Sequence, residues 1–286
     1  LADKAPTPDL RPNEEALVFD LSDAPAVHQA CQGVQAVVHF GGVPLERPWE
    51  DILQANIIGS YNIYEGARKA GVPRVVYASS SSAYGDTPTL PKVETMPSNP
   101  ISPYSISKYT GEMYTRVFSQ LFGLETVALR YFNAAGADPE GETGEAHDPE
   151  THLIPRLLMA VTGTAPPLTV FGSDYPTPDG TCIRDYVHVE DLVQAHIEAI
   201  KVIPRRDTLA MNVGTGVGAS VLEVLRACSL AAGREVPFRM GARRNGDPPR
   251  LVSHPEKIFR LTNWRPARSS LEDIARSAGR WFEKEK

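Results

Sequence analysis

Cysteine is scarce in this chain of 286 residues, which contains only Cys31, Cys182 and Cys228, an odd number at wide spacings. This scarcity excludes a disulfide framework and a cysteine-rich zinc motif, and it predicts reduced thiols in a cytoplasmic protein. No apolar run approaches the ~18 residues of a membrane span, and no signal peptide is visible. A net charge of −6 excludes a general attraction to nucleic acid or acidic membranes. No grouping of His, Asp, Glu and Cys indicates a metal site.

Short apolar, β-branched runs alternate with helical patterns through the first half of the chain. Predicted strands cover residues 16–21, 36–42, 74–78 and 126–133, and apolar residues at helical spacing fill residues 49–69. Such apolar strands are typical of a parallel sheet that is buried on both faces. The alternation predicts an α/β fold of the Rossmann type, a doubly wound parallel sheet, with a smaller C-terminal substrate lobe.

The stretch from residue 74 to residue 108 holds the candidate catalytic groups. The strand at 74–78 continues into a run of serines, and the carboxyl end of a strand is where open α/β sheets bind ligands. Further along, Pro103 opens a helix on which Tyr104 and Lys108 share one face. An ammonium beside a phenol lowers the pKa of the phenol, which would allow Tyr104 to act as a base near neutral pH. The alternative is a surface tyrosine with a solvated lysine.

The order of an apolar strand, a serine run and Tyr-x-x-x-Lys at a helix start resembles the extended short-chain dehydrogenase/reductase family, which includes the sugar-nucleotide epimerases. The resemblance implies that Ser80, four residues before Tyr84, is a catalytic hydroxyl. It also implies that Tyr104 is the catalytic base and acid, and that Lys108 is its electrostatic partner.

The same resemblance implies NAD as the cofactor. A dinucleotide-binding fold opens with a strand and a glycine-rich turn, followed ~20 residues later by an acid for the ribose. That first strand and loop are expected to be absent, because Asp3 stands in the place of the ribose acid, and weak NAD binding is therefore expected. Singly, Asp3 also fits a frayed terminus, Asp20 a helix cap and the two glycines a turn. The expected cofactor-binding residues are Asp3, Asp20, Leu21, Phe40, Gly41, Gly42, Asn56, Ser79, Tyr104, Lys108 and Phe132.

A second glycine-rich segment, residues 214–219, also passes as a dinucleotide fingerprint. It follows a strand-like run and precedes a helical pattern at 221–232, with Glu235 at roughly the distance of a ribose acid. A lone match is weak, and residues 237–244 do not make a convincing buried strand. We therefore expect this loop to support the sugar-nucleotide lobe and not the cofactor.

The second half of the chain resembles the UDP-glucose 4-epimerases, in residues 130–137, 151–155, 173–192 and 242–247. The resemblance implies a UDP-sugar substrate. Fork-shaped guanidinium groups suit its diphosphate, and a carboxylate suits its ribose hydroxyls. The implied contacts are the diphosphate with Asn133, Arg184 and Arg244, the uridine with Leu153 and Phe171, and the ribose with Asp247. The expected substrate-binding residues are Ser80, Tyr104, Asn133, His152, Leu153, Phe171, Arg184, Tyr186, Arg244, Asp247 and Leu251.

Three of these residues have ordinary alternatives. His152 also fits a packed core histidine, and Arg244 lies in an arginine-rich stretch that is typical of a solvated basic surface. Leu251 stands where the resembled epimerases carry either a tyrosine or a small residue facing the 2-substituent of the sugar. Its alternative is ordinary packing together with Val252.

These assignments predict a NAD-binding domain over residues 1–133, to which segments within about 183–215 return, and a sugar-nucleotide lobe over 134–182 and 216–286. The predicted activity is NAD-dependent 4-epimerisation of UDP-glucose and UDP-galactose through a 4-keto intermediate, in a homodimer. Three alternatives stay open. Residues 39–71 resemble the uronate dehydrogenases, residues 79–131 resemble the N-acetylhexosamine 4-epimerases, and a missing first strand favours an inactive fold that only binds sugar nucleotides.

Overall fold

The computed structural model describes residues 1–7, 10–203, 210–244 and 246–284. The chain forms two compact units. Unit 1 consists of Leu1–Thr87, Glu94–Tyr131 and His196–Met211, and unit 2 consists of Pro88–Val93, Phe132–Ala195 and Asn212–Lys286. Within the stretch 183–215, which we expect to return to the first domain, the segment that belongs to unit 1 is His196–Met211.

Unit 1 is built on a parallel sheet. β3 (Ala36–His39), β4 (Arg74–Ser80) and β5 (Glu125–Tyr131) pair in parallel, and β9 (Ala210–Val213) completes the order β3-β4-β5-β9. The β-branched run of β4 is buried between its neighbours, as a central parallel strand requires. β1 (Ala2–Asp3) and β2 (Leu17–Val18) form a separate parallel pair. The predicted α/β fold with parallel strands is confirmed.

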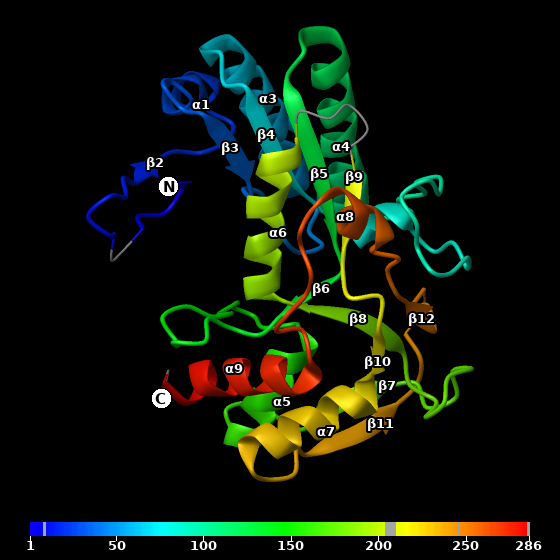
Figure 1. Ribbon diagram of the computed structural model, residues 1–286. Coiled ribbons are helices and arrows are strands. Elements are labelled where there is room, and N and C mark those ends of the chain that lie inside the picture. Colours follow the sequence, from blue (N-terminus) through cyan, green and yellow to red (C-terminus); the bar gives the residue numbers. More distant parts are fainter. Residues whose placement is uncertain (8–9, 204–209, 245, 285–286) are drawn as a thin grey trace. The chain divides into compact units, whose positions relative to one another are not determined.

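Three helices share one core with this sheet (Figure 1). α1 (Ala24–Ala30), α3 (Gly59–Ala70) and α4 (Pro103–Phe122) pack against side chains of β4 and β5. α4 begins after Ser102, which exchanges hydrogen bonds with Ser105 in a capping box. The helix ends at Gly123, whose φ of 69° is left-handed. The cap sets where α4 begins, and therefore where Tyr104 stands.

Two short segments depart from the predicted elements. The helical pattern at 49–69 divides into α2 (Trp49–Ile52), a π-helical segment η1 (Leu53–Ile58) and α3. π-Helical turns are frequent at functional sites, and η1 carries the buried side chain of Asn56. The serine run forms a 3₁₀-helix, η2 (Ser81–Tyr84), so β4 ends at Ser80.

Unit 2 combines two small sheets with a packed set of helices (Figure 1). β8 (Ile183–His188) is central to one sheet and pairs with β6 (Asn133–Ala135), β10 (Gly218–Ser220) and β12 (Arg250–Leu251). β7 (Leu168–Phe171) pairs in parallel with β11 (Phe238–Gly241), an exposed strand. The helices that share the core of this unit are α5 (Leu153–Thr162), α7 (Val221–Ala232) and α9 (Leu271–Lys284). α8 (Glu256–Leu261) also belongs to unit 2, and α6 (Val189–Val202) lies in unit 2 up to Ala195 and in unit 1 from His196.

The three cysteines are buried free thiols. Cys31 lies in unit 1, and Cys182 and Cys228 lie in unit 2. Burial raises the pKa of all three thiols, that of Cys228 to about 12. Across residues 1–7, 10–203, 210–244 and 246–284, no helix combines the length and the apolar character that crossing a membrane requires.

Candidate active site

Three candidate catalytic groups come together in unit 1. Tyr104 and Lys108 stand one turn apart in α4, and the side chain of Tyr104 hydrogen-bonds with Ser80 at the end of β4. Ser80 Oγ also accepts a hydrogen bond from the Ser82 amide at 3.1 Å, which fixes the hydroxyl. The buried Lys108 Nζ donates to the Ala78 carbonyl at 2.9 Å and lies 5.7 Å from the centre of the Tyr104 ring. This arrangement excludes the alternative of a surface tyrosine with a solvated lysine.

Loss of hydration dominates the acidities of these groups. Burial raises the pKa of Tyr104, and the hydrogen bond with Ser80 offsets part of that rise. Burial also lowers the pKa of Lys108 to about 8. The expectation that Lys108 brings the pKa of Tyr104 down is wrong for this structure. The ammonium lies over the ring and donates to a carbonyl, so burial of the phenol outweighs its field.

A chain of hydrogen bonds positions the start of α4. Asn56 Nδ2 donates to Ser107 Oγ at 3.0 Å, and Ser107 Oγ donates to the Tyr104 carbonyl at 2.7 Å. The same asparagine holds the Val43 backbone, accepting from its amide at 2.6 Å and donating to its carbonyl at 3.1 Å. The Tyr104 amide donates to Glu46 Oε1 at 3.1 Å. Asn56 therefore links the loop after β3 to the helix that carries Tyr104.

A buried ion pair lies behind the catalytic groups. Arg130 donates to Glu112 through Nε at 2.8 Å and Nη2 at 2.6 Å, and the two side chains are 5% and 7% exposed. Ser79 Oγ donates to the same carboxylate at 2.5 Å. These contacts join β4, α4 and β5. Ser79, an expected cofactor-binding residue, directs its hydroxyl to Glu112 and so braces the strand end that carries Ser80.

A cavity of about 310 Å³ in unit 1 gathers six of the expected cofactor-binding residues. Carboxylates and apolar side chains are both suited to a nucleoside, because the former accept from ribose hydroxyls and the latter cover a base. Asp20 Oδ1 accepts from the amide and the hydroxyl of Ser22, and the backbone hydrogen bond lowers the pKa of this carboxyl most. The six residues are Asp3, Asp20, Leu21, Phe40, Gly41 and Gly42.

The local structure tests the ordinary alternatives for Asp20 and Gly42 and places Phe132. Asp23, not Asp20, caps α1 by accepting from the Ala26 amide at 3.1 Å. Gly42 has a φ of 140°, and a Cβ there would lie 2.8 Å from Asn56 Oδ1, so only glycine fits. Phe132 belongs to unit 2 and is buried there, outside the lining of this cavity.

A second cavity, of about 210 Å³, lies in unit 2 and gathers eight of the expected substrate-binding residues. Its lining combines guanidinium groups, a carboxylate, an amide and aromatic rings. That donor set is what a nucleoside diphosphate requires. The eight residues are Asn133, His152, Leu153, Phe171, Arg184, Tyr186, Arg244 and Asp247.

The polar groups of the second cavity already contact other groups of unit 2. Arg184 forms an ion pair with Asp247 and donates to the Pro248 carbonyl at 2.9 Å. The Arg244 guanidinium lies over the Phe171 ring at 4.4 Å, although the residue is exposed, so the alternative of a solvated basic surface stays open. Asn133 Nδ2 donates to the Asp185 carbonyl at 3.0 Å.

Two expected substrate-binding residues need separate comment. His152 differs from its ordinary alternative, and Leu251 lies apart from the second cavity. His152 is 47% exposed and its Nδ1 pairs with Glu145, so it is not a packed core histidine. Leu251 lies in β12, opposite Arg184 of β8, outside the lining of the second cavity. Its backbone therefore adjoins a residue that lines the cavity.

The model of the NAD dependent epimerase/dehydratase family matches residues 3–214. This chain belongs to that family. The relationship inferred from the sequence motifs is confirmed, and NAD is the cofactor of the family.

Relatives and solved structures agree with this membership. A UDP-glucose 4-epimerase from Azospirillum brasilense is 43% identical over 254 residues, which span 87% of this chain and 73% of the relative. The structure of UDP-glucose 4-epimerase from Brucella ovis with NAD has a TM-score of 0.89 at 39% identity, and the match covers 94% of this chain and 85% of that one. The enzyme from Bifidobacterium longum with NAD+ and UDP has a TM-score of 0.86 at 30% identity, covering 94% and 83%.

The second glycine-rich segment of this family member has a structural task. Asp185 is fully buried, and its carboxylate accepts from the amides of Thr215 at 2.8 Å, Gly216 at 3.0 Å and Ser253 at 3.1 Å. The hydroxyls of Thr215 and Ser253 donate to it at 2.7 and 2.5 Å. Because these loop amides are taken by a carboxylate of the chain itself, they are not available to a pyrophosphate.

Sequence reasoning missed one cluster of chemical groups. Glu145, His147, Glu150 and His152 each bring a possible metal-ligand atom within 4.8 Å of the others. The expectation that no such grouping exists is therefore corrected. The signal was present as Glu-x-His-x-x-Glu-x-His over residues 145–152, but these residues lie in a loop, where spacing alone does not show which side chains converge.

Proposed function

We propose that this chain catalyses NAD-dependent 4-epimerisation of a UDP-hexose and interconverts UDP-glucose and UDP-galactose. The observation that carries the proposal is the hydrogen-bonded pair of Tyr104 and Ser80 with Lys108 beside the ring. Epimerisation at C4 needs one group that removes a proton from the 4-hydroxyl and later returns it, and this pair can do both. The activity named for relatives that are up to 43% identical supports the same reaction.

Tyr104 is assigned the proton transfers. Its phenolate takes the proton of the 4-hydroxyl as hydride leaves C4. The phenol gives the proton back to O4 when hydride returns to the other face of the 4-keto sugar. NAD, which the cavity of unit 1 would hold, would supply the hydride acceptor and then the donor. Because burial raises the pKa of Tyr104, a group that favours its ionisation matters, and Ser80 is assigned that task. Lys108 is assigned to positioning, through its hydrogen bond to the Ala78 carbonyl.

The cavity of unit 1 is assigned to the adenosine part of NAD. Asp3 and Asp20 are its acceptors for ribose and adenine, and Leu21 and Phe40 are its apolar walls. The glycine backbone at Gly41 and Gly42 allows close approach of the pyrophosphate. Asn56 holds the start of α4, and we assign it to the nicotinamide side as a positioning residue.

The cavity of unit 2 is assigned to the UDP part of the substrate. Arg184 and Arg244 are assigned to the diphosphate, Asp247 to the ribose and Phe171 to the uridine. The ion pair between Arg184 and Asp247 orients both groups before the nucleotide arrives, which reduces the entropy lost on binding. A nucleotide that stays anchored while the 4-keto sugar turns over is what the reaction requires.

The decisive experiment compares Tyr104→Phe with Tyr109→Phe, a control in the same helix. We expect Tyr104→Phe to lower the turnover of UDP-galactose by at least a hundredfold, because it deletes the proton transfer, and to leave UDP binding by calorimetry within about twofold. Tyr109→Phe should retain turnover. Turnover of Tyr104→Phe equal to that of the parent would remove Tyr104 from the reaction. Accumulation of NADH during turnover by the parent would instead identify a dehydrogenase.

Preference for the 2-substituent of the sugar is assigned to Leu251. Leucine is shorter than tyrosine and offers no hydroxyl, so we expect UDP-N-acetyl sugars to be poorer but detectable substrates. A pocket-size effect of this kind is worth roughly 1–3 kcal/mol. Leu251→Tyr should sharpen the preference for plain hexoses, measured as kcat/KM for both sugar pairs. An N-acetyl preference that this substitution leaves unchanged would contradict the assignment.

Location and assembly stay predictions. The buried, free thiols support a reducing compartment such as the cytoplasm. The homodimer implied by the resemblance is tested by light scattering of the purified protein.

A further inference from the structure

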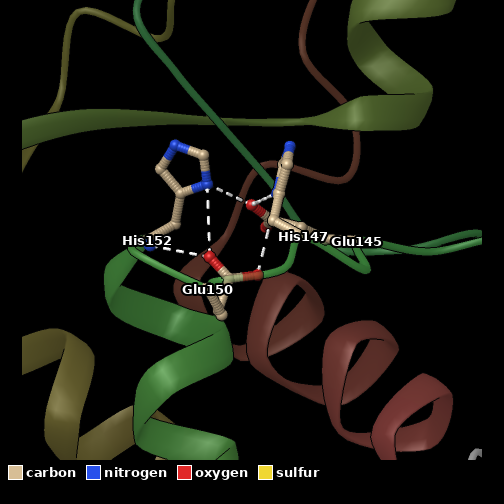
Figure 2. Close-up of side chains that lie close together, drawn as sticks. All are labelled: Glu145, His147, Glu150 and His152. Carbon is tan, nitrogen blue, oxygen red and sulfur yellow. Dashed lines mark hydrogen bonds and ion pairs between the residues drawn. The ribbon is translucent and has the colours of Figure 1, made fainter. Parts of the chain in front are cut away.

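The loop between β6 and α5 brings two carboxylates and two imidazoles together in unit 2. Figure 2 shows the side chains of Glu145, His147, Glu150 and His152 converging, with the two histidine rings on one side and Glu150 facing them. All four candidate ligand atoms lie within 4.8 Å of one another. The cluster is distinct from the groups assigned above to proton transfer and to the diphosphate.

Helix α9 holds this loop in place. Trp281 Nε1 donates to the Glu145 carbonyl at 3.0 Å, and Lys284 Nζ donates to the Glu140 carbonyl at 2.8 Å. A Cβ on Gly144 would lie 2.3 Å from the Trp281 ring, so the backbone there runs directly against the indole. The side chains of the cluster therefore project from a supported backbone, which a bound ion would not have to order.

The distances within the cluster match the edges of a small coordination polyhedron. His147 Nδ1 lies 3.1 Å from Glu145 Oε1 and 3.7 Å from Glu150 Oε2, and His152 Nδ1 lies 3.5 Å from Glu150 Oε1. His152 Nδ1 also pairs closely with Glu145 Oε1. Ligands at about 2.1 Å from a tetrahedral ion are separated by about 3.4 Å, so small shifts of these side chains would place all four around one centre.

One carboxylate oxygen of the cluster is left without a donor. Glu150 is 5% exposed at its side chain, and its Oε2 has no hydrogen-bond partner among the described residues, although it faces His147. Its Oε1 accepts from the amides of Thr151 at 2.7 Å and His152 at 2.8 Å, which fixes the direction of the carboxylate. A buried carboxylate oxygen without a donor is costly, and a cation at the cluster would satisfy it.

We propose that Glu145, His147, Glu150 and His152 form a binding site for one divalent cation of the zinc class. Two imidazole nitrogens and two carboxylate oxygens are a ligand set that zinc accepts, and four protein ligands are typical of a closed, structural site. The ion fixes the end of the loop at the start of α5. Because Thr151 and His152 also line the cavity of unit 2, the ion holds one wall of that cavity.

The test uses the full, untagged chain after removal of metal by a chelator. We expect Co²⁺ to give the intense visible absorption of a tetrahedral site at one equivalent, and Zn²⁺ to displace it. Saturating Zn²⁺ should raise Tm by roughly 5 °C or more. If Co²⁺ gives no such band and Zn²⁺ no shift in Tm, the cluster is a self-sufficient network of hydrogen bonds and the proposal is wrong.

Variants decide whether these side chains are the ligands. Glu150→Gln can keep the acceptor for the Thr151 and His152 amides while replacing the charged Oε2, so the fold should be retained. We expect Glu150→Gln and His147→Gln each to weaken Co²⁺ binding at least tenfold. Glu140→Gln, an exposed change in the same loop, should bind like the parent. Equal binding by the parent and both ligand variants would place the metal elsewhere and overturn the assignment.

Discussion

The two units bury negative charge in different ways. In unit 1 the carboxylate of Glu112 meets the guanidinium of Arg130 in two hydrogen bonds, and both side chains are buried. In unit 2 the carboxylate of Asp185 is fully buried and is held by three backbone amides and two hydroxyls. One carboxylate is neutralised by a side chain, and the other is solvated by neutral donors of the backbone and of hydroxyl groups.

This difference decides whether a second substitution can offset the loss of the buried carboxylate. Arg130 and Glu112 can be exchanged together for apolar residues, because each is the main partner of the other. The donors to Asp185 come largely from the backbone of Thr215, Gly216 and Ser253, which only a substitution by proline can remove. The same holds for Asp191, whose carboxylate accepts from the amides of Ala267 and Arg268. In unit 2, therefore, the loss of a buried carboxylate cannot be offset by replacing one partner side chain.

The largest loss is expected from Glu112→Ala. This change leaves the Arg130 guanidinium buried without its carboxylate, and such a change costs about 3–5 kcal/mol. The free energy of unfolding in urea measures it. The double variant Glu112→Leu with Arg130→Met should recover most of that loss. A double variant that is less stable than Glu112→Ala would mean that the ion pair is not replaceable.

A smaller loss, about 2–4 kcal/mol, is expected from Asp185→Asn, because the amide group turns donors toward donors at Gly216 or Ser253. Hydrogen exchange at Gly216 should rise by at least tenfold, since its amide loses the Oδ2 acceptor, whereas the Thr215 amide keeps the remaining oxygen and should stay protected. Unchanged protection of the Gly216 amide would show that it does not depend on the second carboxylate oxygen.

Lys108 tests a third case, a buried cation whose acceptor is a carbonyl. Its pKa of about 8 in the folded chain is below the ordinary value of 10.5, so the unfolded chain binds more protons between pH 8 and 10.5. Stability should therefore rise as pH increases through that window, and below pH 8 the full penalty, about 3 kcal/mol, is present. Lys108→Met should stabilise the protein at pH 7 by about 2 kcal/mol, after loss of the hydrogen bond to Ala78, while activity falls. Thermal unfolding of the parent and of Lys108→Met from pH 6.5 to 10 measures the pH dependence and the gain in stability. A Lys108→Met variant less stable than the parent at pH 7 would contradict the prediction.

The smallest effect is expected at the surface of α9. Arg276 pairs with Glu272 at 2.6 Å and Asp273 at 3.0 Å, but all three side chains are at least 40% exposed. Exposed pairs contribute about 0–1 kcal/mol and weaken in salt. Arg276→Ala should change the free energy of unfolding by less than about 1 kcal/mol. This value is the reference against which the losses at the buried charges are compared. A loss close to that of Glu112→Ala would erase the distinction.

Elements with a strong local signal are predictable from the sequence. The run at 74–78 forms β4 because it is apolar and β-branched, and α4 begins at Pro103 as this proline indicates. The helix expected over 221–232 spans α7 with the same bounds. The gathering of Asp3, Asp20 and Phe40 around one cavity agrees with the family resemblance. It does not follow from strand pairing, because β1 and β2 form a pair separate from the sheet of β3.

Features that depend on side-chain convergence are not predictable in this way. The pKa of Tyr104 depends on how deeply its hydroxyl is buried, which the Tyr-x-x-x-Lys spacing does not contain. Residues 237–244 hold the strand β11, which is exposed and takes its pairing from β7, so the sequence alone gives little signal. The cluster at Glu145 to His152 arises from a loop that α9 holds, across a long separation in sequence.

The buried thiols allow the local opening of each unit to be measured separately. A cysteine with a raised pKa and no access to solvent reacts with an alkylating reagent only after its surroundings open, so the rate of modification measures local opening. Cys31 reports on unit 1, and Cys182 and Cys228 report on unit 2. Mass spectrometry of the labelled peptides can therefore time each unit within one sample. UDP or a bound cation should slow the labelling of the second pair more than that of Cys31, without any probe added to the chain.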